Sequence, residues 1–562
     1  MPERLTNAPE EAEEPEERQE EPEEREEDRA QERGTPDGPA DRRKAGIFLG
    51  VLLAMVAAYV AVFLTLSLLR YSNFRGSGLD TAIYNQVIWL FSRFKAPVST
   101  LRGMHFFGDH LSPMLVLLAP LGWLGKGKPP AVLTVQTLAL AAGAIPVYLL
   151  SVRKLHSRWA GLGLAATYLL YPALQNLNLA DFHPEALGTV FLLFAFLAID
   201  KRSFGWFYAL CVLTVITKED MALPVLVLGI VVYFLYDKRA GAMAAIGSAV
   251  YFLAAVLLLI PWFAPAGYQY SSRLTAFGST TGEAVKNFFL KPRNTLGVIA
   301  TRPNLRYFFD LLAPVAFLSF FAPVFLLPAL PAFLVNVISD FQPQHTIFQQ
   351  YTVAIIPFVF IAVVFGLKRF RKWSEGAFRP GFVTGGVVAV VLACSIAGNF
   401  YLSPSPISAE FRGASYGSDR HITAMRRGLD RIPPNASVSA QTYMLAQLSN
   451  RRELYQFPEP FRYLADVKHY DNLGRMLGAD QKGAVRTVFP KTYRTKDKGA
   501  GIAPEYVIVD SGSTYRISTE MYDQVVEALQ ARGGYVMIYS SDGVKVFRKA
   551  HPARRSPGGG VR

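Results

Sequence analysis

Residues 178–188 read NLADFHPEALG and stand between two apolar runs, GLGLAATYLLYPALQ at 161–175 and TVFLLFAFLAI at 189–199. Apolar runs of roughly 17 to 25 residues recur along the chain, and each is long enough to cross about 30 Å of hydrocarbon. The 562 residues are 51% hydrophobic and only 18% charged. This composition excludes an ordinary soluble protein and predicts an α-helical polytopic membrane protein.

The net charge of +14 is unevenly distributed along the chain. Residues 1–40 contain sixteen Asp and Glu against five Arg, so the remaining residues carry +25. An acidic, Pro-rich segment without large apolar side chains cannot bury enough surface to offset its ordering entropy. We therefore predict a disordered cytoplasmic tail over 1–44 and a disordered basic tail over 551–562. The basic remainder suits anionic lipid, and nothing indicates nucleic acid.

Clusters of Lys and Arg near span ends mark the cytoplasmic side of a membrane protein. Such clusters are DRRK at 41–44, VRKLHSR at 152–158, DKR at 200–202 and 237–239, and LKRFRK at 367–372. When the spans are placed so that all of these clusters lie in the cytoplasm, the N-terminus is cytoplasmic and the end of the chain lies outside. The eleven predicted spans are 46–69, 130–151, 159–178, 185–199, 204–218, 221–236, 241–262, 305–321, 323–339, 351–367 and 381–401.

The transmembrane domain, 45–401, has a long first outer loop at 70–129. Within it, Leu79, Ile83, Val87, Leu90 and Phe94 form an apolar stripe at helical spacing, which predicts a helix along the membrane surface. The apolar segment 111–124 is too short to span, so we expect an interfacial helix there as well.

With this topology, five polar clusters face the extracytoplasmic side. They are Asp80, HFFGDH with His105, Asp109 and His110, DFHPE with Asp181, His183 and Glu185, KED with Lys218, Glu219 and Asp220, and the segment 340–351 with His345 and Tyr351. Convergence of this kind is expected for an active site at a membrane surface.

Each cluster also has a structural explanation. Asp80 and Asp181 are suited to capping the helices that follow them. The KED segment suits a solvated turn, although ionisable side chains near hydrocarbon usually have partners or a function. His345 suits an ordinary loop surface.

A metal site is a further possibility. Imidazole and carboxylate ligands are present in Asp80, Asp109, His110 and His183, but their spacing matches no dedicated zinc motif. A hard ion such as Mg²⁺ or Mn²⁺ fits phosphate chemistry better.

These motifs together carry a resemblance to a known family. GLDTAIYNQVIW, GDHLSP, DFHPE, KED and HTIFQQYTVAIIPF, followed by IPPNASVSAQ, RRELYQFP and YVIVDSG, resemble in order an uncharacterised family of prokaryotic polytopic membrane proteins with a domain-of-unknown-function label. The likeness covers roughly 45–550.

More remotely, the layout resembles the GT-C superfamily of membrane glycosyltransferases, which use polyprenyl-phosphate sugars. Asp80 matches the early acidic residue of that superfamily, which implies a catalytic base or metal ligand. GDHLSP resembles the His-Pro-Pro element of some members, with Ser112–Pro113 in its place, and Thr81 replaces the second residue of an acidic pair.

The resemblance implies transfer of a sugar from a polyprenyl-phosphate donor to a cell-envelope acceptor at the outer face of the plasma membrane. Carboxylates would stabilise the cationic reacting carbon, and cations would bind the phosphate. The predicted catalytic residues are Asp80, His110, Asp181, His183 and Glu185. The predicted substrate-binding residues are Arg75, Lys218, Glu219, Asp220, Arg273, His345 and Tyr351.

Residues 402–550 are predicted to form an extracytoplasmic α/β domain. PEYVIVDSGS and GYVMIYSSDGVKVFRK are typical of strands, and STEMYDQVVEALQARGG is typical of a helix ending at Gly533. ASVSAQTYMLAQLSNRRELYQF resembles a strand, helix, strand unit. The net charge of +9 over 402–562 suits an anionic surface.

Two other functions remain open. A lipid or polysaccharide transporter would explain the Pro-rich region 314–331, because transporter helices are often broken within the membrane. A non-catalytic scaffold on a transferase fold is the second.

Overall fold

The structure is a computed structural model that describes residues 39–264, 270, 273–278, 281–375, 377–461, 504–512, 519–531 and 534–550. Residues 1–38 of the predicted acidic tail, the basic tail 551–562 and Gly533 lie outside them. The first apolar helix, α2 (Pro39–Ser72), begins seven residues before the predicted span. Helix α2 therefore contains the basic segment 41–44, which was predicted to belong to the disordered tail.

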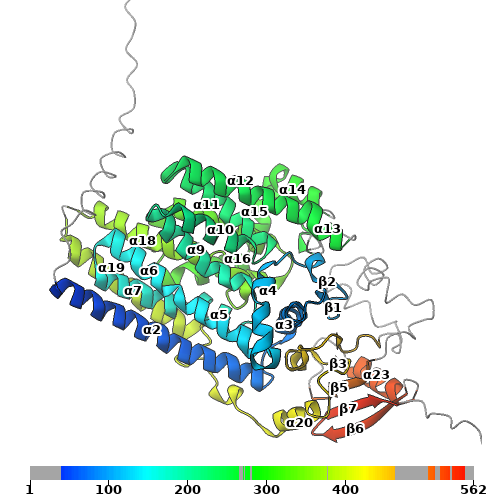
Figure 1. The fold of residues 1–562 in the computed structure, drawn as a ribbon. Coiled ribbons are helices and arrows are strands. Elements are labelled where there is room, and N and C mark those ends of the chain that lie inside the picture. Colours follow the sequence, from blue (N-terminus) through cyan, green and yellow to red (C-terminus); the bar gives the residue numbers. More distant parts are fainter. Residues whose placement is uncertain are drawn as a thin grey trace, which may run out of the picture. The chain divides into compact units, whose positions relative to one another are not determined.

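Long apolar helices make up most of the described chain between 39 and 402 (Figure 1). After α2 come α5 (Pro130–Ala142), α6 (Ala144–Leu155), α7 (Arg158–Leu170), α8 (Pro172–Leu179), α9 (Glu185–Asp200), α10 (Phe204–Val215), α11 (Ala222–Leu235), α12 (Lys238–Ala254), α13 (Ile260–Phe263), α14 (Thr281–Leu290), α15 (Pro292–Ile299), α16 (Arg302–Leu312), α17 (Leu330–Ile338), α18 (Ile356–Trp373) and α19 (Pro380–Leu402). Helix α7 packs against α6 and α19, α9 against α10, and α11 against α12.

By length and composition, four helices in the described part of the chain can cross a membrane: Arg43–Ser72, Pro130–Leu155, Lys238–Phe263 and Pro380–Leu402. Their mean hydropathies of 1.7 to 2.8 agree with a membrane protein. The count of eleven spans stays a prediction.

The region 313–329 does not form a regular span. It consists of the 3-10 helices η7 (Ala313–Val315), η8 (Leu318–Phe321) and η9 (Pro323–Ala329). Proline lacks a backbone N–H and clashes with the preceding turn, so its recurrence here breaks the α-helix. Ala316 and Phe317 adopt left-handed backbone conformations between the first two pieces.

The first outer loop carries α3 (Leu79–Ser92), β1 (Val98–Ser99), β2 (Met104–His105), η2 (Phe106–Gly108), α4 (Met114–Leu117) and η3 (Ala119–Gly127). The apolar stripe of α3 predicted one buried face, whereas the structure also buries Asn85 and Gln86. Their side chains donate hydrogen bonds to Ser449 and Thr100. The helix ends before Phe94, which is 93% exposed and has a positive φ.

A five-stranded mixed sheet follows, in the order β4-β3-β5-β7-β6 (Figure 1). Its strands are β3 (Val438–Ala440), β4 (Leu454–Gln456), β5 (Tyr506–Asp510), β6 (Tyr535–Ser541) and β7 (Val544–Lys549). Strand β3 pairs in parallel with β4 and β5, while β7 is antiparallel to β5 and β6. Between β3 and β4, the 3-10 turns η13 (Thr442–Met444) and η14 (Ala446–Leu448) replace the helix of the predicted strand, helix, strand unit.

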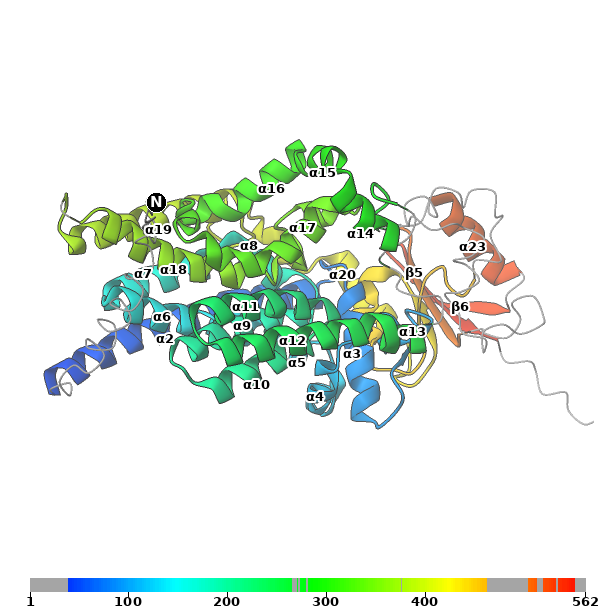
Figure 2. The ribbon, with the colours of Figure 1, turned by 90° about the horizontal axis from the view of Figure 1, so that it is seen from above.

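Both faces of this sheet are covered. On one face, α23 (Thr519–Ala531) buries Val525 and Leu529 against Val507 and Phe547 (Figure 2). On the other, α20 (Arg420–Leu429) and the turns η13 and η14 pack on Ile508 and Val546. That second cluster also contains Phe74 and Ala82 from the α2–α3 region. The first outer loop and the sheet therefore share one apolar core.

Candidate active site

The N-terminus of α3 and the segment between α8 and α9 meet through the Asp181 carboxylate. The Asp181 carboxylate accepts hydrogen bonds from the backbone N–H groups of Gly78 and Asp80, each at 3.1 Å. The N-cap residue of α3 is Gly78, which has no side chain to cap the helix. Asp181 thus caps α3 rather than the helix that follows it in sequence, and this leaves the Asp80 carboxylate available for other contacts.

Asp80 instead pairs with His183, the Oδ2 and Nε2 atoms lying 3.3 Å apart. The other ring nitrogen of His183, Nδ1, donates to the backbone carbonyl of Asp181 at 2.6 Å. The backbone N–H of His183 donates to the Gln136 side chain, and that of Phe182 donates to Thr81. The imidazole is therefore oriented from both sides, and it is only 4% exposed, whereas the Asp80 side chain is 45% exposed.

Charge pairing shifts the pKa values of this group. Burial raises the pKa of the Asp80 carboxyl, but the hydrogen bond and the charge of His183 outweigh burial and hold the pKa below its ordinary value. Burial lowers the pKa of His183, but Asp80, Glu185 and Asp181 together raise it to about 9. Near neutral pH, Asp80 is a carboxylate and His183 an imidazolium. Burial and the neighbouring Asp80 charge raise the pKa of Asp181.

A second charged group lies in the KED segment after α10, where Lys218 precedes η4 (Glu219–Met221) and the two acidic residues begin it. Lys218 Nζ lies 2.9 Å from Asp220 Oδ2 and 3.6 Å from Glu185 Oε1, on the first turn of α9. Glu219 is fully buried; its Oε1 lies 2.8 Å from His110 Nδ1, and its Oε2 accepts the backbone N–H of Leu111. The KED segment thus joins the DFHPE and HFFGDH segments.

A third group extends the site from the first outer loop. Arg102 donates to both oxygens of Asp109, at 2.7 and 2.9 Å. Tyr270 donates its hydroxyl to Asp109, and its ring stacks on His110 with centroids 4.7 Å apart. Both Arg102 and Asp109 lie close enough to Asp80 to influence its pKa. Four of the five polar clusters are therefore brought together.

Two predicted binding residues, Arg75 and His345, and the cluster residue His105 have their contacts elsewhere. Arg75 pairs with Asp419 at 3.1 Å, and His105 stacks on Phe263 with centroids 4.1 Å apart. Both ring nitrogens of His345 are occupied, by the side chain of Asn304 and the carbonyl of Ser339.

Arg273 lies at the edge of the site. Its guanidinium is sandwiched between the rings of Tyr270 and Phe341, 4.7 and 4.4 Å from their centroids. The Tyr351 ring packs edge-on against Phe341, with ring centroids 6.2 Å apart.

The candidate metal ligands are engaged with one another, with Glu219 or with Arg102. His110 and His183 are both paired with carboxylates that favour the imidazolium form, which does not bind metals. Asp109 is held by Arg102. Among the described residues, no three His, Cys, Asp or Glu side chains are grouped to hold a metal ion. As arranged here, these residues do not fit a divalent ion.

Several residues of the site were missed by the sequence reasoning. Arg102 and Tyr270 carried no motif. Gln136 offered a usable signal, because a polar side chain inside the predicted span 130–151 needs a partner. Gly78 also offered a signal, because a glycine directly before a predicted helix often marks a left-handed backbone conformation. In the structure its φ is 69°, which glycine adopts without strain.

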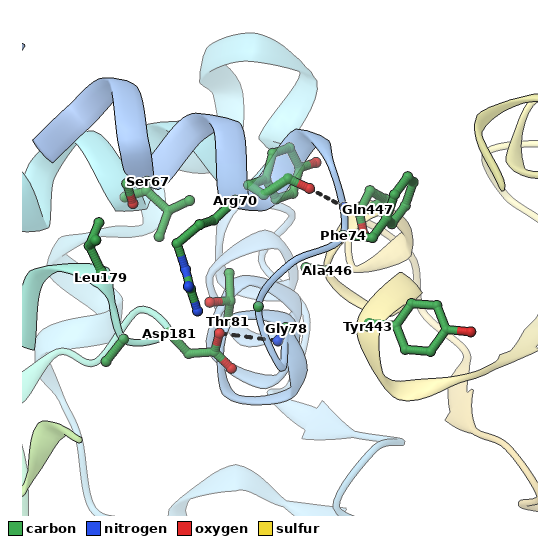
Figure 3. A pocket seen from close by; sticks show the side chains of 14 residues that line it. Ser67, Arg70, Phe74, Gly78, Thr81, Leu179, Asp181, Tyr443, Ala446 and Gln447 are labelled. Carbon is green, nitrogen blue, oxygen red and sulfur yellow. Dashed lines mark hydrogen bonds between the residues drawn. The ribbon is translucent and has the colours of Figure 1, made fainter. Parts of the chain in front are cut away.

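A small cavity of about 30 Å³ lies behind Asp181, large enough for roughly one or two water molecules. Figure 3 shows Arg70 and Asp181 lining it, together with Tyr443, Ala446 and Gln447 from the η13–η14 segment. Residues of the site and of the sheet region therefore line this cavity together.

The chain matches the family model described as "Predicted membrane protein (DUF2079)" over residues 70–546. It belongs to this family. The resemblance noted from the sequence motifs is thereby confirmed, and every residue of the site described above lies in the matched part of this DUF2079 protein.

No curated protein matches the DUF2079 chain. Among solved structures, it is similar to ArnT from Cupriavidus metallidurans in the apo state, with 13% identity and a TM-score of 0.47, over 90% of this chain and 98% of ArnT. It is also similar to the archaeal oligosaccharyltransferase AglB from Archaeoglobus fulgidus, in complex with an inhibitory peptide and a dolichol-phosphate. Identity is 13% and the TM-score 0.38, over 90% of this chain and 75% of AglB.

Proposed function

We propose that this protein is a membrane glycosyltransferase that moves a sugar from a polyprenyl-phosphate donor to a cell-envelope acceptor at the extracytoplasmic face. One observation carries the proposal: an accessible carboxylate, Asp80, is held ionised by the buried His183. Glu185, whose charge also acts on His183, links this pair to Lys218, 3.6 Å away. Side chains from segments about 100 residues apart along the chain supply these charges.

In the proposed reaction, the acceptor hydroxyl donates a hydrogen bond to the Asp80 carboxylate. Its oxygen forms a bond to the anomeric carbon while the bond from that carbon to the phosphate oxygen breaks. The bonding electrons leave with the polyprenyl phosphate, and the hydroxyl proton passes to Asp80. Because Asp80 has a low pKa, this proton moves late, once the new bond has acidified the hydroxyl.

Lys218 is the proposed partner of the leaving phosphate, with Arg273 at the edge of the site as a second cation. Glu185, Glu219 and Asp220 offset the positive charge until the donor arrives. Carboxylates around the reacting carbon stabilise its oxocarbenium character. His183 acts through Asp80 and is therefore a positioning residue, as is Asp181.

The proposed topology has the N-terminus in the cytoplasm, eleven spans, and the sheet region as an α/β domain outside the membrane. The site lies at helix ends, since α9 begins at Glu185 and α11 follows the KED segment. Ionisable side chains at these positions avoid the cost of the hydrocarbon core. A lipid donor would enter sideways between the helices.

Transport of the same lipid is the second candidate. The broken segment η7–η9 is of the type that transporters use, because unwound backbone within a membrane usually lines a cavity or pathway. A transporter would move the lipid between leaflets and leave its glycosidic bond intact.

The deciding experiment uses the full chain in nanodiscs with a panel of polyprenyl-phosphate sugars, and follows free polyprenyl phosphate. Wild type should release it, and Asp80→Asn should not. Asp430→Asn is a matched control, because it removes one exposed carboxylate from the far end of α20.

Release by Asp80→Asn at the wild-type rate would refute the role of Asp80. Intact donor across the whole panel would refute transfer. Movement of intact donor between leaflets of a liposome would then identify a transporter.

A further inference from the structure

The short linker between α2 and α3, residues 73–78, is held together with the last residue of α2 by α20, which belongs to the sheet region. Arg426 Nη2 donates to the backbone carbonyl of Ser72 at 3.0 Å and to the side-chain oxygen of Asn73 at 2.6 Å. Arg75 pairs with Asp419, the residue that caps α20. These bonds join residues more than 340 positions apart, and they all reach the chain just before Asp80.

The end of α2 and the side chain of Asn73 are held as well. Gln447 donates to the backbone carbonyl of Tyr71 in the last turn of α2 at 2.6 Å, and the side-chain amide of Asn73 donates to the carbonyl of Tyr416 at 2.5 Å. At Gly78, an added Cβ would lie 3.4 Å from Ala446, so η14 packs closely on the residue that starts α3.

Apolar contacts accompany these bonds. Phe74 in the linker and Ala82 in the first turn of α3 lie in the same buried cluster as Met425 of α20 and Val438 of β3. The linker therefore cannot shift without disturbing the core on one face of the sheet.

The opposite side of the α3 N-terminus is held by Asp181. Its carboxylate binds the N–H groups of Gly78 and Asp80, while its carbonyl orients His183. The 3.3 Å contact between Asp80 and His183 thus depends on two supports, Asp181 on one side and α20 on the other.

We propose that α20 is a positioning element for the candidate active site, and that Arg426 is the positioning residue that holds the linker so that Asp80 meets His183. The α2–α3 linker is short and ends at a left-handed glycine, so it has freedom to move once its bonds are lost. In this proposal the sheet region helps to position the active site, whether or not it also binds the acceptor. The catalytic consequence rests on the proposed function, but the placement of the linker does not.

Hydrogen–deuterium exchange of the full chain in nanodiscs tests the placement directly. In Arg426→Gln, the amides of 73–82 should exchange at least about tenfold faster, because the linker opens locally more often. Arg427→Gln is the matched control: Arg427 is the next residue of α20, is exposed, and makes no hydrogen bond or ion pair with any residue that the structure describes. It should leave the exchange unchanged.

Arg426→Lys keeps the charge but loses the fork that reaches Ser72 and Asn73 together, so it should give an intermediate acceleration. Exchange at 73–82 in Arg426→Gln that equals the wild-type rate would overturn the proposal. If exchange rises throughout the chain, the variant has been destabilised globally. Arg426→Lys then decides, because wild-type exchange at 73–82 in that variant would also overturn the proposal.

Kinetics provide the second readout. In Arg426→Gln, the rate of donor consumption should fall about tenfold at saturating donor, because a misplaced catalytic group lowers kcat. The acidic limb of its pH–rate profile should move to higher pH, because Asp80 loses its contact with His183. An altered rate with an unmoved profile would contradict the positioning role. Faster exchange without any transfer in wild type would leave the placement standing and refute the proposed function.

Discussion

Two aspartate–histidine pairs in this protein are built from the same groups and differ in which partner is buried. In the Asp80–His183 pair, the carboxylate is 45% exposed and the imidazole 4%. In the His421–Asp510 pair, between α20 and the end of β5, the imidazole is 33% exposed and the carboxylate 1%. Burial is therefore reversed between the candidate active site and the sheet.

The other contacts of each pair show why it matters which partner is buried. Buried Asp510 also accepts bonds from Tyr443 and the backbone of Gly512, and His421 reaches Asp542 in the β6–β7 turn. All of these contacts tie elements of the sheet region together. Asp80 offers an accessible carboxylate that His183 keeps ionised. A buried carboxylate is suited to hold a fold, and an exposed one is available to react.

The largest expected effect contrasts the two carboxylates. Asp80→Asn should lower the rate of donor consumption by about 10³-fold without unfolding the protein, because a general base usually contributes a factor of this size to the rate. Asp510→Asn should keep the rate within about threefold while lowering the thermal stability of the sheet region, because it weakens a buried hydrogen-bonded group. Initial rates and thermal melting in nanodiscs measure both. A larger loss of rate in Asp510→Asn than in Asp80→Asn would reverse the assignment.

The next effect concerns His183 and pH. Its pKa in the folded protein is about 9, above the ordinary 6.5, so its imidazolium stabilises the pair fully below about pH 6.5 and is lost as pH rises through about 9. The wild-type rate should therefore fall above about pH 9. His183→Gln should be about 10- to 100-fold slower, and its profile should lack this alkaline limb. Persistence of the limb in the variant would assign it to another group.

A third carboxylate–histidine pair sharpens the comparison, because both of its partners are largely buried. Glu219 is 1% exposed and His110 14%. Burial lowers the pKa of His110, but Glu219 outweighs this and raises it. Glu219→Gln should lower the free energy of unfolding by about 1–3 kcal/mol, since it removes a charged hydrogen-bond partner. Chemical denaturation in detergent measures this, with Asp430→Asn expected to have no effect.

The smallest effect is expected at His421. Burial lowers its pKa, but Asp510 and Asp542 outweigh burial and raise it above the ordinary value. Its contribution to stability is thus complete below about pH 6.5 and declines as pH rises through the higher folded-state pKa. Exposure screens the pair, so we expect a difference below about 1 kcal/mol. Exchange in β5 and β7 should rise with pH more in wild type than in His421→Gln.

The positions of the polar clusters were predictable for a physical reason. Ionisable side chains are costly within hydrocarbon, so the Asp, Glu and Lys residues between apolar runs had to stand at helix ends. Once the spans were oriented, the DFHPE and KED segments were expected on one side. In the structure, the DFHPE segment contacts Asp80 through Asp181 and His183, and the KED segment contacts the DFHPE segment through Lys218 and Glu185.

The pairing within the site was not predictable, because it depends on side-chain directions in space. Local sequence suggested that Asp80 and Asp181 each cap their own following helix. In the structure, Asp181 caps the helix of Asp80, and Asp80 binds the histidine two residues after Asp181. Arg102 and Tyr270 reach Asp109 from positions that no motif marked.

The amino-acid sequence by itself determined the membrane class, the family and the presence of strands in the last part of the chain, because hydrophobic run length, ordered motifs and β-branched patterns are local properties. Only the tertiary structure decided that Asp80 is the accessible member of its pair and that α20 holds the linker before it. Contacts such as Arg75–Asp419 span 344 positions, and local patterns carry no information about partners so far apart in the chain.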